Sequence, residues 1–202
     1  MSAQSKAQLS EAVYLAHEAT AMEKSEFLNG EVFAMAGASR VHNQLTSNLV
    51  VALGSQLLDK PCSVYASDMK VHTLSESISK YSYPDLVATC GKEQFEDENT
   101  TVLLNPLLII ELLSDSTEAY DRGLKFFHYQ LIPSLREYLL VAQAYCRVEH
   151  YYRQADQQWV YSEYHRLEDV VSLPSLGCEL KLAEIYRRVL YVSGRKKISS
   201  SG

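Results

Sequence analysis

Several features that would assign this protein to a special class are absent from its sequence. Only four of its 202 residues are cysteines, at positions 62, 90, 146 and 178, and they form no CxxC or CxxH pair. A zinc site is therefore disfavoured, and we expect reduced cysteines in strand or core positions. The longest apolar stretch, 102–113, contains asparagine, proline and glutamate. It is too short and too polar to span a bilayer, which takes about 20 apolar residues.

The N-terminus also lacks the basic and then apolar run of a signal peptide, so we expect a cytoplasmic protein. Glycine and proline are scarce, and no stretch rich in either divides the chain. The content of 47% hydrophobic and 22% charged residues is that of a globular protein with a full hydrophobic core. We therefore predict one domain over 1–202, with its core at about 11–190 and frayed termini at 1–9 and 193–202.

The charge balance is mildly acidic. The chain has 25 Asp and Glu against 19 Lys and Arg, which gives a formal net charge of −6. This excess argues against a protein that coats nucleic acid through bulk positive charge. It is compatible with a local basic groove, or with a nuclease that binds its substrate at low affinity.

Hydrophobic periodicity predicts a mixed order of helices and strands. Helices are expected at 11–20, 41–58, 119–131 and 182–186. Strands are expected at 62–73, 81–89, 103–113, 136–142, 146–152, 159–164 and 170–173. The pair Asn29-Gly30 between strand-forming residues predicts a hairpin. The nearly all-apolar segment 103–113 predicts a central strand covered on both faces, so the expected fold class is α/β, a mixed sheet with helices on its faces.

Two carboxylates stand inside apolar strand segments. Asp85 begins the segment DLVA, and Glu111 lies in the middle of IIELL. Burying a carboxylate is unfavourable unless another group compensates its charge. One explanation is an Arg or Lys that pairs across the sheet. The other is a divalent cation held between two carboxylates that face one another from consecutive strands. Both explanations stay open at this point.

A helix with regularly spaced polar residues follows the second of these strands. Asp121, Lys125 and Tyr129 are four residues apart and share one helix face. That face points back at the strand ends, or Asp121 and Lys125 merely form a weak ion pair on the helix surface.

A set of short motifs occurs in a fixed order over roughly residues 14–186. The motifs are EFLNGE at 26–31, GASRVH at 37–42, SDMKV at 67–71, YPDL at 83–86, ELLS at 111–114, D-x-x-x-K-x-x-x-Y at 121–129 and EYLLV at 137–141. This ordered set resembles the Uma-two family of restriction-endonuclease-like proteins, which is part of the PD-(D/E)XK nuclease superfamily.

The resemblance implies a restriction-endonuclease-like core, with a helix, three antiparallel strands, a second helix and a parallel strand, and extra antiparallel strands here. In such nucleases an Asp and a Glu on the second and third strands bind Mg²⁺ (or Mn²⁺), which gives these roles to Asp85 and Glu111. A lysine two residues after the Glu helps to activate water, but this position is Leu113. Lys125 is the expected replacement, and Lys70 is its rival.

Other polar residues are weaker site candidates. Glu31 is either a third carboxylate of the site or a surface strand residue. His42 either orients a phosphate or the metal-bound water, or makes a polar contact at the start of its helix. Asp68 either neighbours the metal or ends a hairpin. Trp159 and the tyrosines of 145–164 either stack on bases or pack within strands.

The resemblance implies a metal-dependent endonuclease that hydrolyses phosphodiester bonds of nucleic acid, with DNA as the expected substrate. The alternative is a catalytically weak or inactive protein of the same fold that serves as a nucleic-acid-binding or dimeric scaffold. The missing lysine at position 113 and the net charge of −6 favour this alternative. A third interpretation is a hydrolase of small phosphoesters. A homodimer is expected because many such nucleases cut two strands, and Lys125→Ala is expected to abolish cleavage with little effect on the melting temperature.

Overall fold

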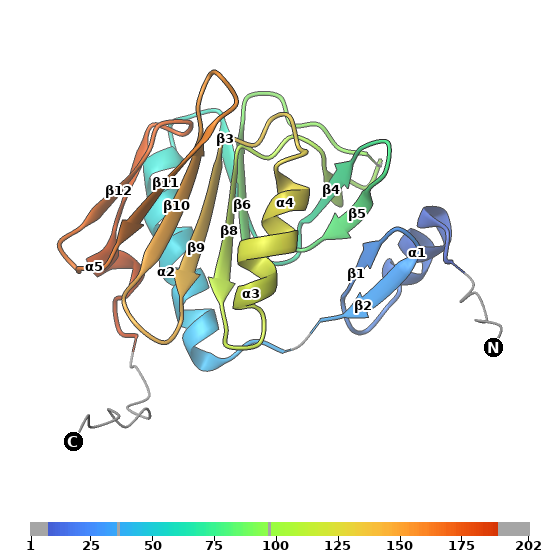
Figure 1. Cartoon of the computed structure of the whole chain (residues 1–202), viewed down its shortest axis with the longest axis horizontal. Coiled ribbons are helices and arrows are strands. Elements are labelled where there is room, and N and C mark those ends of the chain that lie inside the picture. Colours follow the sequence, from blue (N-terminus) through green and yellow to red (C-terminus); the bar gives the residue numbers. More distant parts are fainter. Residues whose placement is uncertain (1–7, 36, 97, 190–202) are drawn as a thin grey trace, which may run out of the picture.

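The computed structural model describes residues 8–35, 37–96 and 98–189 (Figure 1). The helical elements are α1 (Glu11–Glu18), α2 (Arg40–Leu57), α3 (Glu118–Tyr120), the π-helical segment η1 (Asp121–Lys125), α4 (Phe126–Tyr129) and α5 (Leu182–Ile185). The strands are β1 (Ser25–Leu28), β2 (Glu31–Ala34), β3 (Cys62–Ala66), β4 (Lys70–Leu74), β5 (Ser79–Ser82), β6 (Leu86–Cys90), β7 (Val102–Leu103), β8 (Leu108–Leu113), β9 (Glu137–Ala142), β10 (Val148–Arg153), β11 (Trp159–Tyr164), β12 (Val170–Leu173) and β13 (Cys178–Lys181).

Frayed ends were expected at 1–9 and 193–202, and of these residues 1–7 and 193–202 lie outside the described part of the chain. Leu9, which was expected to fray with them, donates its backbone N–H to the Gly30 carbonyl at 3.0 Å. None of the described helices is both long and apolar enough to cross a membrane.

The strands form a six-stranded sheet, a five-stranded sheet and a small third sheet. The orders are β11-β10-β9-β8-β6-β3, β2-β1-β5-β4-β7 and β12-β13. In the six-stranded sheet β8 pairs antiparallel with β6 and parallel with β9, and all six of its residues are buried. The prediction of a central strand is therefore confirmed for 108–113, and the expected α/β class of mixed sheets flanked by helices is confirmed as well.

Three of the predicted strands are each divided in two, and the halves belong to different sheets. Segment 62–73 becomes β3 and β4, segment 81–89 becomes β5 and β6, and segment 103–113 becomes β7 and β8. Pro84 and Pro106 lie at two of these breaks, where proline has no N–H to continue a ladder. The chain therefore crosses between the two large sheets at each of these three breaks, which brings residues of both sheets into one region.

Helix α2 covers one face of the six-stranded sheet. The Ser39 side chain caps its N-terminus by accepting the His42 N–H at 3.0 Å. Its buried apolar residues recur at helical spacing, as the sequence predicted, and they pack with Leu86, Ile110 and Leu112. Since side chains alternate along a strand, these sheet residues all point to the same face.

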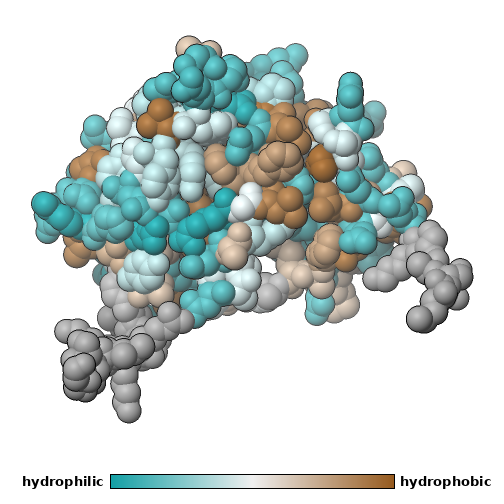
Figure 2. All heavy atoms as spheres, viewed as in Figure 1, coloured by the Kyte–Doolittle hydropathy of each residue, from teal (hydrophilic) through white to brown (hydrophobic). Residues whose placement is uncertain are grey.

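The chain from α3 to α4 covers the opposite face, as Figure 1 shows in yellow. Phe126 and Tyr129 pack there with Ile109 and Leu113 of β8. Glu111 is two residues from each of these positions of β8. Because strand side chains alternate between faces, Glu111 points to this same face. On the outer side of the helix Leu124 and Phe127 are exposed, and Figure 2 shows apolar side chains gathered around this region.

The predicted hairpin at Asn29-Gly30 is confirmed by β1 and β2. Both turn residues have positive φ, 48° at Asn29 and 95° at Gly30, which is the requirement of a type I′ turn. On its other side β1 pairs with β5.

The expectation that all four cysteines are reduced is wrong for one pair. Cys62 on β3 and Cys90 on β6 are direct partners in the antiparallel ladder and form a disulfide. Cys146 and Cys178 are free. Spacing in the sequence did not reveal the pair, because only the strand register places the two residues opposite one another.

Candidate active site

Glu111 and Lys125 are in direct contact beneath the helix. The Lys125 Nζ lies 2.8 Å from Glu111 Oε1, and the two residues are 7% and 3% exposed. Tyr129 donates its hydroxyl to the same carboxylate oxygen at 3.0 Å. The contact of Lys125 with Asp121, 3.7 Å, is longer, and Asp121 is itself buried. The interpretation of Asp121 and Lys125 as a surface ion pair is therefore wrong.

Two residues of the five-stranded sheet join this cluster, although the sequence analysis did not select them. Glu26 of β1 places Oε1 3.4 Å from the Lys125 Nζ and Oε2 3.8 Å from the Lys80 Nζ. Lys80 of β5 is only 1% exposed and donates to the Tyr120 hydroxyl at 2.9 Å. The sequence could have indicated Glu26 as a site residue. It is the first residue of the EFLNGE motif, and it lies on the opposite strand face from the buried Phe27.

Burial shifts the pKa values of these groups. It raises the pKa of Glu111 to about 8; the Lys125 charge opposes this shift, whereas the Asp85 and Asp121 charges add to it. Burial would lower the pKa of Lys125, but the charges of Glu111, Glu26 and Asp121 together raise it well above its usual range. The pKa of Asp121 is raised, chiefly by burial. The Lys125 ammonium is therefore firmly charged, while Glu111 and Asp121 take up protons more readily than exposed carboxylates do.

Burial also lowers the pKa of Lys80 to about 8. The Glu26 charge opposes this shift, and the Lys125 charge adds to it. The two lysines thus differ, since the carboxylates outweigh burial only at Lys125. Lys80 is the lysine that loses its proton more easily.

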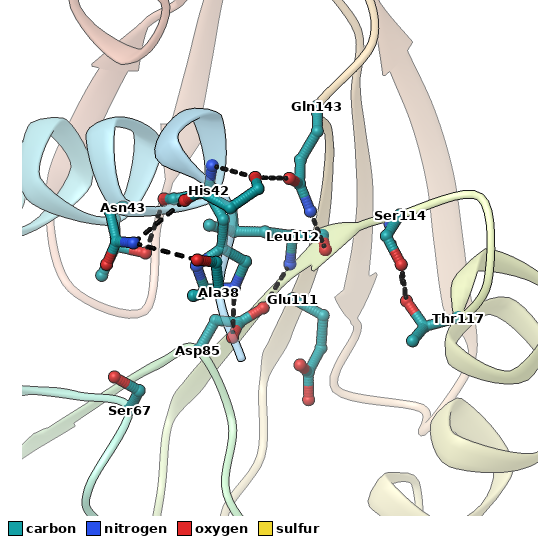
Figure 3. A network of polar contacts seen from close by, with 12 residues as sticks. Ala38, His42, Asn43, Ser67, Asp85, Glu111, Leu112, Ser114, Thr117 and Gln143 are labelled. Atoms are coloured by element: carbon teal, nitrogen blue, oxygen red, sulfur yellow. Dashed lines mark hydrogen bonds and ion pairs between the residues drawn. The ribbon is translucent and has the colours of Figure 1, made fainter. Parts of the chain in front are cut away.

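Asp85 stands immediately before β6, where the ladder with β8 begins. Leu86 pairs with Ile110, and the same antiparallel register continued by one residue places Asp85 opposite Glu111. The Asp85 Oδ2 accepts the Leu112 N–H at 2.7 Å, and Oδ1 lies 2.8 Å from His42 Nε2 (Figure 3). The two carboxylates are thus neighbours in register, but Figure 3 shows the Asp85 carboxylate turned toward His42 and Leu112 and the Glu111 carboxylate pointing away from it.

His42 connects helix α2 to this arrangement. It lies in the first turn of α2, and its Nε2 holds Asp85. Its Nδ1 is buried and has no hydrogen-bond partner among the described residues. The contact at the start of the helix that the sequence suggested is therefore a contact with a candidate metal ligand.

The remaining candidates lie elsewhere. Glu31 is exposed on β2, and Asp68 is exposed and pairs with Lys24 at 2.8 Å. Lys70 is buried and donates to the Tyr83 hydroxyl at 3.2 Å, and that hydroxyl in turn donates to Glu18. Lys125, rather than Lys70, is the lysine that contacts Glu111.

The aromatic residues of β10 and β11 take part in packing. Trp159 lies edge-on against Phe126, with ring centroids 5.2 Å apart, and the Arg153 guanidinium lies over its indole ring. Tyr151 contacts Phe126 and Tyr138. These contacts support strand packing as the role of these rings.

The donor set restricts how a metal ion would bind. No group of three or more His, Cys, Asp or Glu side chains in the described part of the chain is arranged to hold one. Asp85 and Glu111 offer two neighbouring carboxylates. Mg²⁺ is commonly bound by one or two carboxylates, with water and substrate phosphates completing its shell. Asp85 and Glu111 match that number of carboxylates, and each of them is held by its own protein partners.

Comparisons with known proteins identify the family of the chain. Residues 12–183 match the Uma2 family model, which is described as "Putative restriction endonuclease". The Synechocystis sp. relative "Uncharacterized protein sll1609" is 43% identical over 155 residues, which cover 77% of this chain and 86% of the relative. A second, "Uncharacterized protein slr1290", is 32% identical over 183 residues, which cover 91% of this chain and 94% of the relative.

A crystal structure from Anabaena variabilis ATCC 29413, described as a "putative nuclease belonging to DUF820", is similar with a TM-score of 0.70. The similarity covers 89% of this chain and 98% of the other at 16% sequence identity, and it shows that the two share a fold.

Proposed function

Because the chain belongs to the Uma2 family, we propose that it is a metal-dependent endonuclease that hydrolyses phosphodiester bonds of DNA. One observation carries the proposal: the Lys125 Nζ lies 2.8 Å from the buried Glu111. A helix thus supplies the lysine that strand β8 lacks at Leu113.

In the proposed site Asp85 and Glu111 would hold Mg²⁺ or Mn²⁺. The ion, when bound, polarises the scissile phosphate and lowers the pKa of a coordinated water. Tyr129 orients Glu111 through Oε1, and the Leu112 N–H orients Asp85 through Oδ2. The charged Lys125 ammonium donates a hydrogen bond to the attacking water or to a phosphate oxygen, where it stabilises developing negative charge.

A second candidate function is a non-catalytic nucleic-acid-binding or dimeric scaffold. It is favoured by the separate partners of the two carboxylates, since Asp85 is held by His42 and Leu112 while Glu111 is held by Lys125 and Tyr129. A protein that never binds a metal would keep this arrangement.

A cleavage assay distinguishes the candidates. Wild type, Asp85→Ala, Glu111→Ala and the exposed control Glu31→Ala would be incubated with plasmid DNA, single-stranded DNA, RNA and a small phosphodiester, in Mg²⁺ and in Mn²⁺. The proposal expects DNA cleavage by wild type and by the control, and none by the other two variants. Calorimetric titration with Mn²⁺ should show binding that Asp85→Ala loses. Wild type that neither binds Mn²⁺ nor cleaves DNA would favour the scaffold. Cleavage of the small phosphodiester alone would favour a hydrolase of small phosphoesters.

We also propose a homodimer, because one hydrolytic site cuts one strand and two related sites are suited to both strands of a duplex. Light scattering coupled to gel filtration tests this proposal, and a monomer mass at working concentration would contradict it.

A further inference from the structure

Glu26 and Lys80 complete a closed ring of contacts with the three residues at the proposed active site. The Lys125 Nζ lies 2.8 Å from Glu111 and 3.4 Å from Glu26. The other oxygen of Glu26 lies 3.8 Å from the Lys80 Nζ. The Lys80 Nζ lies 5.5 Å from the centroid of the Tyr129 ring. The Tyr129 hydroxyl donates a hydrogen bond to Glu111 at 3.0 Å, which closes the ring.

The ring is assembled from elements of both large sheets. Glu111 and Lys125 come from β8 and from η1, whereas Glu26 and Lys80 come from β1 and β5. Lys80 is the ladder partner of Leu28, which shares a face of β1 with Glu26. Glu26 and Lys80 therefore project from the same face of the five-stranded sheet toward the helix.

A lysine side chain is flexible and needs several contacts to hold its ammonium in one place. Lys125 has three N–H donors on a four-carbon stem, and Glu111 alone restrains it from one direction only. Glu26 restrains it from the five-stranded sheet. Lys80 is 1% exposed and confined between the rings of Tyr120 and Tyr129, so it provides a fixed positive partner for Glu26.

We infer that Glu26 is a positioning residue that holds the Lys125 ammonium against Glu111, and that Lys80 keeps Glu26 in place. The inference rests on the proposed nuclease function and extends it to a second pair of residues. It gives the β1–β2 hairpin a role in the reaction, since β1 carries Glu26.

The test compares Glu26→Gln, Glu26→Asp and Lys80→Met with wild type and with Glu31→Gln, a matched control on the adjacent strand of the same hairpin. Because misplacing a reacting group by about 1 Å can slow a reaction about 100-fold, Glu26→Gln should lower kcat by about 10- to 100-fold. Its KM for DNA and its Kd for Mn²⁺ should stay within about two-fold of wild type, since it acts through Lys125. Glu26→Asp, which keeps the charge, should recover part of the rate, and Lys80→Met should be slow as well. Glu31→Gln should match wild type.

Crystal structures of wild type and Glu26→Gln provide a readout that does not require cleavage. The inference expects Lys125 to lose its contact with Glu111 in the variant. Retention of that contact together with the wild-type rate would overturn it. A parallel loss of Mn²⁺ affinity would instead make Glu26 a metal ligand. Failure of wild type to cleave DNA would refute the proposed function, and the two crystal structures would still decide the positioning role.

Discussion

Lys125 supplies a positive charge that strand β8 does not carry in its own sequence. Position 113, where the superfamily pattern has lysine, is a leucine packed with Phe126 and Tyr138 in the core. Leu113 and Glu111 share a face of β8, and the helix that covers this face carries Lys125. A long side chain from the helix therefore reaches Glu111 on this face of the strand.

Replacement of Lys125 by methionine should abolish cleavage and also destabilise the fold. The sequence alone suggested little change in melting temperature, but Lys125 is buried against three carboxylates. Loss of one partner of a buried ion pair typically lowers stability by about 3–5 kcal/mol. The loss should be smaller at about pH 6 than at about pH 9, because Glu111 can take up a proton at the lower pH. Urea unfolding at both pH values measures this, and equal stability of variant and wild type at the higher pH would contradict it.

The metal-free protein should lose stability as the pH rises toward 8. The pKa of Glu111 is about 8 in the folded protein against an ordinary value of 4.5. An acid with a raised folded-state pKa contributes stability that is complete below the unfolded pKa and is lost as the pH rises through the folded pKa. Glu111→Gln has no proton to lose, so its stability should depend less on pH in this window.

Urea unfolding in EDTA at about pH 5, 6, 7 and 8 measures this dependence. Higher pH is avoided because Lys80, whose pKa is lowered to about 8, contributes a dependence of opposite sign there. Parallel pH profiles for wild type and Glu111→Gln would show that another group causes the change.

At the scale of single elements, the helix over the site departs from α-helical geometry in the segment that carries Asp121 and Lys125. Segment η1 is π-helical from Asp121 to Lys125, between the α-helical turns α3 and α4. Such segments are rare and occur frequently at functional sites. The sequence spacing correctly placed Asp121, Lys125 and Tyr129 on one side, since all three are buried, but it did not predict the wider turn between them.

The β1–β2 turn is expected to be sensitive to substitution. Gly30 has a φ of 95°, and a Cβ at this position would lie 2.7 Å from the Gln8 Cβ. Gly30→Ala should therefore lower the free energy of unfolding by about 1 kcal/mol or more. Gly54→Ala in α2 is the matched control, because its Cβ meets no atom within 4 Å and alanine favours a helix.

Urea titrations of the two variants should therefore shift in opposite directions. If Gly30→Ala also slows cleavage, the effect supports the role of Glu26 on the adjoining strand. A Gly30→Ala variant as stable as wild type would mean that the turn relaxes without strain.

At the scale of the whole molecule, the Cys62–Cys90 disulfide joins the edge strand β3 to β6. For the sequence separation of 28 residues, loop-closure entropy gives a stabilisation of about 3–4 kcal/mol. Reductant should thus lower the urea midpoint of wild type and leave that of a Cys62→Ser/Cys90→Ser variant unchanged. DNA cleavage should persist after reduction, because Cys90 ends β6 at the opposite end from Asp85. A midpoint that reductant does not move, in protein shown by mass spectrometry to contain the bond, would contradict this prediction.

The sequence by itself determined the local elements and indicated the candidate residues of the site. The leucine spacing of α2, the Asn29-Gly30 turn and the apolar run of β8 depend on near neighbours, so propensity and periodicity were sufficient to predict them. Asp85 and Glu111 were selected because carboxylates in apolar segments need compensation, and Lys125 was selected from its helix spacing and the family resemblance. Only the tertiary structure decided that Glu26 and Lys80 join them and that Cys62 meets Cys90. These contacts follow from strand register and from the repeated crossings of the chain between the two large sheets. Both depend on packing between segments distant in the sequence rather than on any local pattern.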